Sequence, residues 1–124
     1  MTLVAPVPKT DTLLISIGDM TRPVNWDQIV WLEADGNYVR IFTRERDYFY
    51  HRSLSDLLAG LGEDRFIRIH RSRAVNIAEI AGIRPLEKGK AELRLRNGQR
   101  LCTSRRFRGD LSRVRVQQRE VTRS

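Results

Sequence analysis

Short apolar runs separated by turn-forming residues make up the first half of the chain. Four of these runs have the length and the β-branched or aromatic content of strands, and they cover residues 13–17, 27–34, 38–43 and 48–51. Asp35-Gly36-Asn37 joins the second run to the third and contains residues that tolerate left-handed turn geometry. We expect successive antiparallel hairpins, with Arg22-Pro23 interrupting any strand ladder after the first run.

One segment departs from the strand pattern. Four leucines recur at the spacing of a single helix face: Leu54, Leu57, Leu58 and Leu61. Ser53 can cap the first turn, and Gly62 suits the position just beyond the last one. The pattern predicts a short helix over residues 53–62 that packs its leucine stripe onto the sheet.

The second half returns to strand patterns. In RFIRIHRSR, residues 65–73, side-chain alternation sends Ile67 and Ile69 to one face and their neighbours to the other. Residues 74–77 and 80–83 form brief strands or connections, and residues 84–90 form a turn. Residues 92–103 form the clearest hairpin, with Asn97-Gly98 as a two-residue type I′ turn.

The ends of the chain differ from its middle. Phe107, Leu111 and Val114 have a spacing compatible with one or two helical turns that Ser104 could cap. We expect a flexible leader over residues 1–11, one domain over residues 12–116 and a flexible basic tail over residues 117–124. A chain of 124 residues has room for one domain with a modest core. Because most of the patterns above are those of strands, the expected fold is mainly β, with short antiparallel sheets.

Composition limits the chemistry. No apolar run approaches the roughly 20 residues of a membrane helix, and one cysteine cannot form an internal disulfide. The two histidines and this cysteine lack metal-ligand spacing, and the sequence has neither a nucleophile elbow nor a glycine-rich phosphate loop. We expect a cytoplasmic protein that is not an enzyme and that needs no cofactor or metal.

The positive charge lies in the second half of the chain. The formal net charge is +8, and counting charged residues gives −2 for residues 1–62 and +10 for residues 63–124. Such a basic region attracts polyanions, of which nucleic acid is the commonest inside cells. A basic surface that is merely solvated is the alternative, because arginine stems often cover apolar neighbours.

Two basic clusters lie where strands are expected to end. Arg71 and Ser72 follow the strand predicted before them, and an arginine at a loop tip can fork onto guanine O6 and N7. Ser104-Arg105-Arg106 stands at an expected helix start, where free N–H groups attract phosphate. The loop Gly36-Asn37-Tyr38 offers an amide and a phenol, although its turn composition alone explains it.

Three segments together resemble the LytTR DNA-binding domain of bacterial transcription regulators: WLEADGNYVRIFT, HRSLSDLLAGLGEDRFIRIHRSRAVNIAEIAGI and LRLRNGQRLCTSRRFRGDL. The resemblance runs from about Asp27 to Leu111 and is most specific between Phe66 and Asn76. It implies an elongated β-β-β arrangement of short sheets with one or two short helices. It also implies a regulator that binds DNA through loops in successive major grooves.

Carried over by position, the resemblance implies roles for single residues. Arg71 and Arg106 are expected at base edges, and Ser72 and Ser104 at phosphates, with Arg105 in the same contact loop. Asn37 or Tyr38 is expected at a base or a sugar. Weaker candidates for DNA contact are Gly36, Arg68, His70, Arg73 and Arg108. Asn76 looks structural, and a packed His70 that fixes the strand end is equally compatible with the sequence.

The resemblance further implies double-stranded DNA as the partner, with direct-repeat promoter sites, a homodimer on DNA and an upstream sensor or receiver domain outside this chain. Two other interpretations stay open. One is a protein-interaction module for an acidic partner. The other is an RNA-binding β domain with four possible stacking platforms: Tyr38, Phe42, Tyr48 and Tyr50. The basic groups lie at strand exits rather than among these aromatics, which favours loops in DNA grooves.

Overall fold

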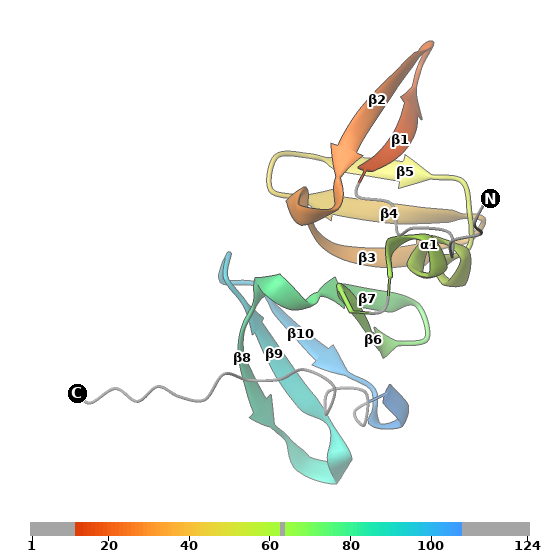
Figure 1. The fold of residues 1–124 in the computed structure, drawn as a ribbon. Coiled ribbons are helices and arrows are strands. Elements are labelled where there is room, and N and C mark those ends of the chain that lie inside the picture. Colours follow the sequence, from red (N-terminus) through yellow and green to blue (C-terminus); the bar gives the residue numbers. More distant parts are fainter. Residues whose placement is uncertain (1–11, 63, 108–124) are drawn as a thin grey trace, which may run out of the picture.

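The computed structural model describes residues 12–62 and 64–107, which fold into three antiparallel sheets (Figure 1). The first sheet pairs β1 (Thr12–Ile17) with β2 (Met20–Asn25). The five-stranded sheet has the order β5-β4-β3-β7-β6, with β3 (Ile29–Asp35), β4 (Tyr38–Thr43), β5 (Asp47–Tyr50), β6 (Phe66–His70) and β7 (Arg73–Asn76). The third sheet has the order β10-β9-β8, with β8 (Ile80–Pro85), β9 (Ala91–Leu95) and β10 (Arg100–Thr103). The expected mainly β fold of short antiparallel sheets is confirmed.

In the described ranges, one α-helix and several short turns of 3-10 helix connect the strands. The helix α1 (Leu54–Leu61) begins where the Ser53 hydroxyl accepts the N–H of Asp56 at 3.0 Å, and it ends at Gly62, whose φ is +100°. The 3-10 turns include η1 (Trp26–Gln28), η2 (Ile77–Glu79) and η3 (Glu87–Gly89). The predicted helix and both of its predicted ends are therefore confirmed.

The five-stranded sheet has a hydrophobic core on each face. One core joins its inner residues to α1 and to the β1–β2 hairpin, and its members include Leu13, Ile15, Leu32, Val39, Ile41, Leu57, Leu61 and Phe66. The other core joins the sheet to the three-stranded sheet through Ile67, Ile69, Val75, Leu93, Leu95 and Leu101. β6 contributes to both cores, because alternate residues of a strand point to opposite faces, as the pattern of residues 65–73 predicts.

The structure corrects the expectation that Arg22-Pro23 interrupts the strand ladder. β2 runs through this pair, and Pro23 lies opposite Leu14 of β1. A two-stranded sheet consists of edge strands only, so the missing N–H of proline can face away from the partner strand. The place of Pro23 at a sheet edge therefore makes it compatible with pairing.

The structure also corrects the turn at Asn97-Gly98. Gly98 has φ +90°, but Asn97 is not among the residues with positive φ, which excludes a type I′ turn. The Gly98 N–H donates to the Leu95 carbonyl at 2.9 Å, and the Leu95 N–H donates to the Gln99 carbonyl at 2.8 Å. This is a three-residue loop in which a type I turn precedes a glycine bulge. The hairpin itself is confirmed.

Candidate nucleic-acid interface

The three loops singled out from the sequence lie together at one edge of the molecule. Backbone hydrogen bonds join them: the Ala34 N–H donates to the Ser72 carbonyl at 2.7 Å, and the Ser104 N–H donates to the Ile69 carbonyl at 2.9 Å. The end of β3, the β6–β7 turn and the end of β10 are therefore neighbours. Figure 1 shows these turns following one another down the right-hand side of the view.

The β3–β4 turn consists of Gly36 and Asn37, because Asp35 pairs directly with Tyr38. Gly36 has φ +63° and Asn37 does not share the positive φ, as in a type II′ turn with glycine at its first central position. Asn37 is exposed at the tip. Tyr38 is 47% exposed, and its ring lies 4.8 Å, centroid to centroid, from that of His51. The phenol therefore stands on the surface next to the turn.

The β6–β7 turn consists of Arg71 and Ser72, between the paired residues His70 and Arg73. Nδ1 of His70 accepts the Ser72 N–H at 3.1 Å, and Oγ of Ser72 lies 3.0 Å from the same nitrogen. The imidazole therefore holds the turn from inside, which favours the packed role for His70. Arg71 is exposed, and no polar partner for its side chain exists in the described part of the chain.

Two weaker candidates for DNA contact are engaged within the protein. Arg68 donates from Nη2 to the Arg71 carbonyl at 2.6 Å and from Nη1 to the Ser55 hydroxyl of α1 at 3.1 Å. Arg73 donates from Nε to Glu33 of β3 at 3.2 Å. Arg68 thus ties the turn to the helix. Sequence reasoning missed Ser55, because a serine on the exposed side of a short helix gives no signal of its partner.

The basic segment after β10 forms one turn of 3-10 helix over residues 105–107, in which the Phe107 N–H donates to the Ser104 carbonyl at 3.1 Å. Arg105 and Arg106 are exposed. The expected helix start is therefore a single 3-10 turn in the described residues. One such turn aligns too few peptide dipoles to attract an anion by itself, so the charges of the arginines must do so. Arg108, Leu111 and Val114 lie outside the described residues.

Ser104 stands in a different environment from the two arginines. Its Oγ is buried and lacks a hydrogen-bond partner among the described residues, as does Nε of Arg68. A phosphate contact from this hydroxyl would therefore require a change of rotamer. The Ser104 N–H is already bonded to Ile69, so the residue also has the structural task of fixing β10 against β6.

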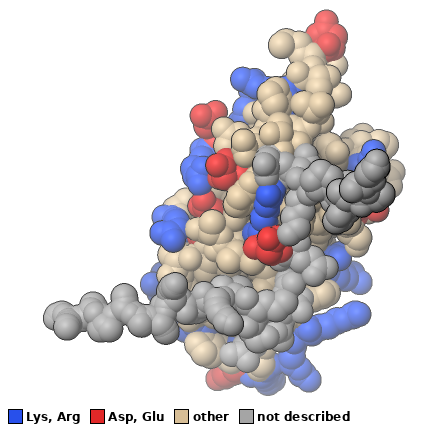
Figure 2. Space-filling view, viewed as in Figure 1, with Lys and Arg blue, Asp and Glu red and all other residues tan. Residues whose placement is uncertain are grey.

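Charge and aromatic exposure differ between the two ends of this surface. Figure 2 shows lysine and arginine side chains projecting at the lower right, where Figure 1 places the end of β10. Two of the four aromatic platforms considered for RNA are closed: Tyr48 is 9% exposed, and the half-buried Phe42 stacks on Trp31 at 4.1 Å. The exposed groups of the edge are therefore mainly charged and turn-borne.

In residues 12–62 and 64–107, no cluster of three or more His, Cys, Asp or Glu side chains could hold a metal ion. No helix in the described ranges is long and apolar enough to cross a membrane. The exposed Cys102 lies on β10.

Comparison with known proteins gives matches to one family of DNA-binding domains. Residues 19–114 match the family model of the LytTr DNA-binding domain. A solved LytTr DNA-binding domain, from a Bacillus cereus protein described as a methyl-accepting/DNA response regulator, superimposes with a TM-score of 0.75 and 26% identity. That match covers 85% of this chain and 96% of the Bacillus cereus chain.

Two curated relatives are longer than this chain. The CO-responsive transcriptional regulator RcoM of Rhodospirillum rubrum is 35% identical over 75 residues, which are 60% of this chain and 32% of that protein. The sensory transduction protein LytT of Bacillus subtilis is 26% identical over 102 residues, which are 82% of this chain and 42% of that protein. The match thus spans less than half of each relative. Because the family model covers most of the chain, this protein belongs to the LytTr DNA-binding domain family of transcription regulators.

Proposed function

We propose that this domain reads a specific sequence of double-stranded DNA by inserting its three neighbouring turns into successive major grooves, and that it regulates transcription in this way. The observation that carries the proposal is the state of Arg71. Its side chain is exposed and without a polar partner in the described structure, while its carbonyl is bonded to Arg68. A free guanidinium on a fixed backbone suits the two-pronged recognition of guanine O6 and N7.

The supports of the turn give this recognition its precision. The β6–β7 turn is held at Ser72 by the Ala34 N–H, at the Arg71 carbonyl by Arg68, and at the Ser72 N–H by His70. Base readout needs a donor placed to within a fraction of an ångström, since a small shift turns a base contact into a phosphate contact. We assign base readout to Arg71 and Arg106, and phosphate contact to Ser72 and Arg105.

We also propose how the domain assembles on DNA. Asn37 or Tyr38 contacts a base or sugar from the β3–β4 turn, in the neighbouring groove. Two copies bind direct-repeat sites in promoters, in the cytoplasm. An upstream sensor or receiver domain controls the binding, and the curated relatives support this point because each is more than twice as long as the matched segment.

The test compares affinities for a selected site and for random DNA. Arg71→Ala and Arg106→Ala are expected to cost about 1–3 kcal/mol on the selected site, roughly 5- to 150-fold in Kd, and little on random DNA. Arg46→Ala, which removes an exposed arginine from the β4–β5 turn, is the matched control and is expected to change neither affinity. Equal losses on both DNAs would make Arg71 a phosphate contact.

A further inference from the structure

A fourth turn touches the proposed interface. The turn that joins β8 to β9 spans residues 86–90, and its Gly89 lies directly against Arg105. A Cβ placed on Gly89 would stand 3.2 Å from Cγ and 3.5 Å from Cδ of Arg105. The backbone of this turn therefore supports the arginine stem, and only a glycine leaves room for it without a shift.

The turn has a strained backbone at a lysine. Lys88 has φ 59° and ψ 34°, and Gly89 has φ +75°, while the Lys90 N–H donates to the Glu87 carbonyl at 3.2 Å. Two central residues with positive φ are the mark of a type I′ turn, in which Asn and Gly are preferred. Lysine has a Cβ, unlike glycine, and it lacks the short amide side chain that lets asparagine tolerate positive φ. Strained residues of this kind are found most often where function requires a particular side chain.

The charges of the turn remain open to solvent. Lys88 and Lys90 are exposed, and neither forms an ion pair with another described residue. The nearby Arg84, by contrast, is paired with Glu92 at 3.0 Å. Glu87 lowers the local charge by one, so the turn and the neighbouring Arg105 together carry a net charge of +2.

We propose that residues 86–90 form a fourth element of the DNA interface, in which Lys88 and Lys90 contact backbone phosphates beyond the phosphate contacted by Arg105. The proposal rests on the proposed function. Figure 1 shows this turn at the lower end of the molecule, continuing the line of the three other turns. Lysine suits phosphate better than a base edge here, because its ammonium is a flexible point charge without the planar fork of arginine.

The test measures DNA affinity against salt concentration for Lys88→Gln, Lys90→Gln and the double variant. The binding constant K falls as salt rises, and each phosphate contact makes the slope of log K against log salt steeper by about 0.9. Each lysine replaced is therefore expected to make the slope shallower by roughly that amount. Between 1 M and 0.1 M salt, the binding constant of each single variant should therefore rise about eightfold less than that of the parent protein. This difference should be the same on selected and on random DNA.

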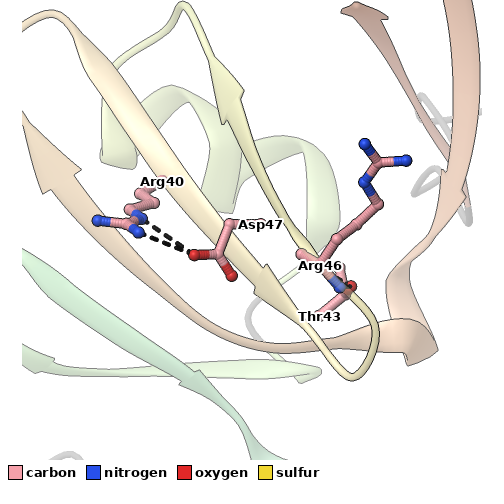
Figure 3. Close-up of polar contacts among 4 residues, drawn as sticks. All are labelled: Arg40, Thr43, Arg46 and Asp47. Carbon is pink, nitrogen blue, oxygen red and sulfur yellow. Dashed lines mark hydrogen bonds and ion pairs between the residues drawn. The ribbon is translucent and has the colours of Figure 1, made fainter.

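The matched control is Arg46→Gln, which removes one positive charge at the other end of the sheet. Figure 3 shows Arg46 extending away from the Arg40–Asp47 ion pair. β4 runs from Tyr38, beside the proposed interface, to Thr43, and strand geometry makes this roughly 17 Å, well beyond the Debye length of about 10 Å at 0.1 M. This variant is expected to keep the parent slope.

A second pair of variants separates binding from folding. Lys88→Gly relieves the positive φ, so its melting temperature is expected to stay level or rise while its DNA binding falls as for Lys88→Gln. Lys90→Arg is expected to keep the parent slope, since it retains the charge. A more stable but weaker-binding Lys88→Gly variant is the signature of a residue kept for its ligand.

The outcomes distinguish the two proposals. Parent slopes for both glutamine variants, together with a specific loss for Arg71→Ala, would overturn the fourth element and leave the proposed function standing. Slopes that fall equally for Arg46→Gln would show a general charge effect and would also overturn it. If the parent protein bound no DNA at any salt concentration, both proposals would fall together.

Discussion

Arg68 offers the sharpest test of how the interface is built. The resemblance made it a weaker candidate for DNA contact, whereas its guanidinium is bonded to the Arg71 carbonyl and to the Ser55 hydroxyl. We predict that Arg68 positions the turn and does not touch DNA. The two roles differ in one observable, since a phosphate contact contributes to the salt dependence of binding and an internal support does not.

The magnitude follows from the two hydrogen bonds. The bond to the Arg71 carbonyl measures 2.6 Å and is charge-assisted, a class that contributes about 1.5–3 kcal/mol, and the bond to Ser55 adds about 0.5–1 kcal/mol. Both bonds are exposed to solvent, which favours the low end of these ranges. Because Arg68 is only partly buried, we expect Arg68→Ala to lower the free energy of unfolding by about 2 kcal/mol. Freeing the backbone of the turn costs about 1–2 kcal/mol of affinity, roughly 5- to 30-fold in Kd.

The assay combines urea denaturation with DNA binding at several salt concentrations. Arg68→Ala should weaken binding to the selected site while the slope against log salt stays at the parent value. Ser55→Ala keeps the charge and removes one bond, so it should show a smaller loss of stability. In a double-mutant cycle, the double variant should lose less stability than the sum of the two single variants, because both remove the same bond. A slope reduced by about 0.9, with unfolding unchanged, would refute the positioning role.

Three further predictions concern single residues. Asn76 is 1% exposed, and Asn76→Ala leaves the Ile29 carbonyl and the Ala78 N–H without their partner. Urea denaturation should therefore show a free energy of unfolding lower by about 2–4 kcal/mol. A loss below about 1 kcal/mol would mean that water replaces the amide. His70→Ala should weaken specific DNA binding several-fold, because it removes the acceptor of the Ser72 N–H in the β6–β7 turn. His70→Asn should keep most of the affinity, since the asparagine oxygen can accept the same Ser72 N–H. Equal losses for the two variants would count against a supporting role for His70. Gly36→Ala should cost about 1 kcal/mol of stability through its φ of +63° alone, because no residue other than its two chain neighbours has an atom within 4 Å of the added Cβ. An unchanged melting temperature would contradict this.

Periodicity predicted the elements well because each pattern reflects a local rule. The leucine spacing of residues 53–62 and the alternation of residues 65–73 both depend on the geometry of a single element. The errors came from judging a residue without its surroundings. Pro23 is compatible with pairing because its strand is an edge, and Asn97-Gly98 became part of a longer loop, although the dipeptide often forms a type I′ turn.

The interface was only partly predictable. Sequence reasoning named the three turns, but the hydrogen bonds that bring them together join residues far apart in the chain, such as Ala34 with Ser72. No local pattern reveals such a bond. The same holds for the support of Arg71 by Arg68, and for the contact between Gly89 and Arg105. Charge count indicated a polyanion partner, whereas only the fold showed which basic residues are free to meet one.

The most direct test of the account is the selection of bound duplexes from a random DNA pool at about physiological salt, because salt sets the share of non-specific affinity. We predict an enriched motif that is repeated in the same direction, with a spacing near one helical turn or a multiple of it. This motif should be lost when Arg71 is replaced by alanine. Binding without any enriched motif, which fades steadily as salt rises, would contradict it and would direct the next experiments to RNA or an acidic protein.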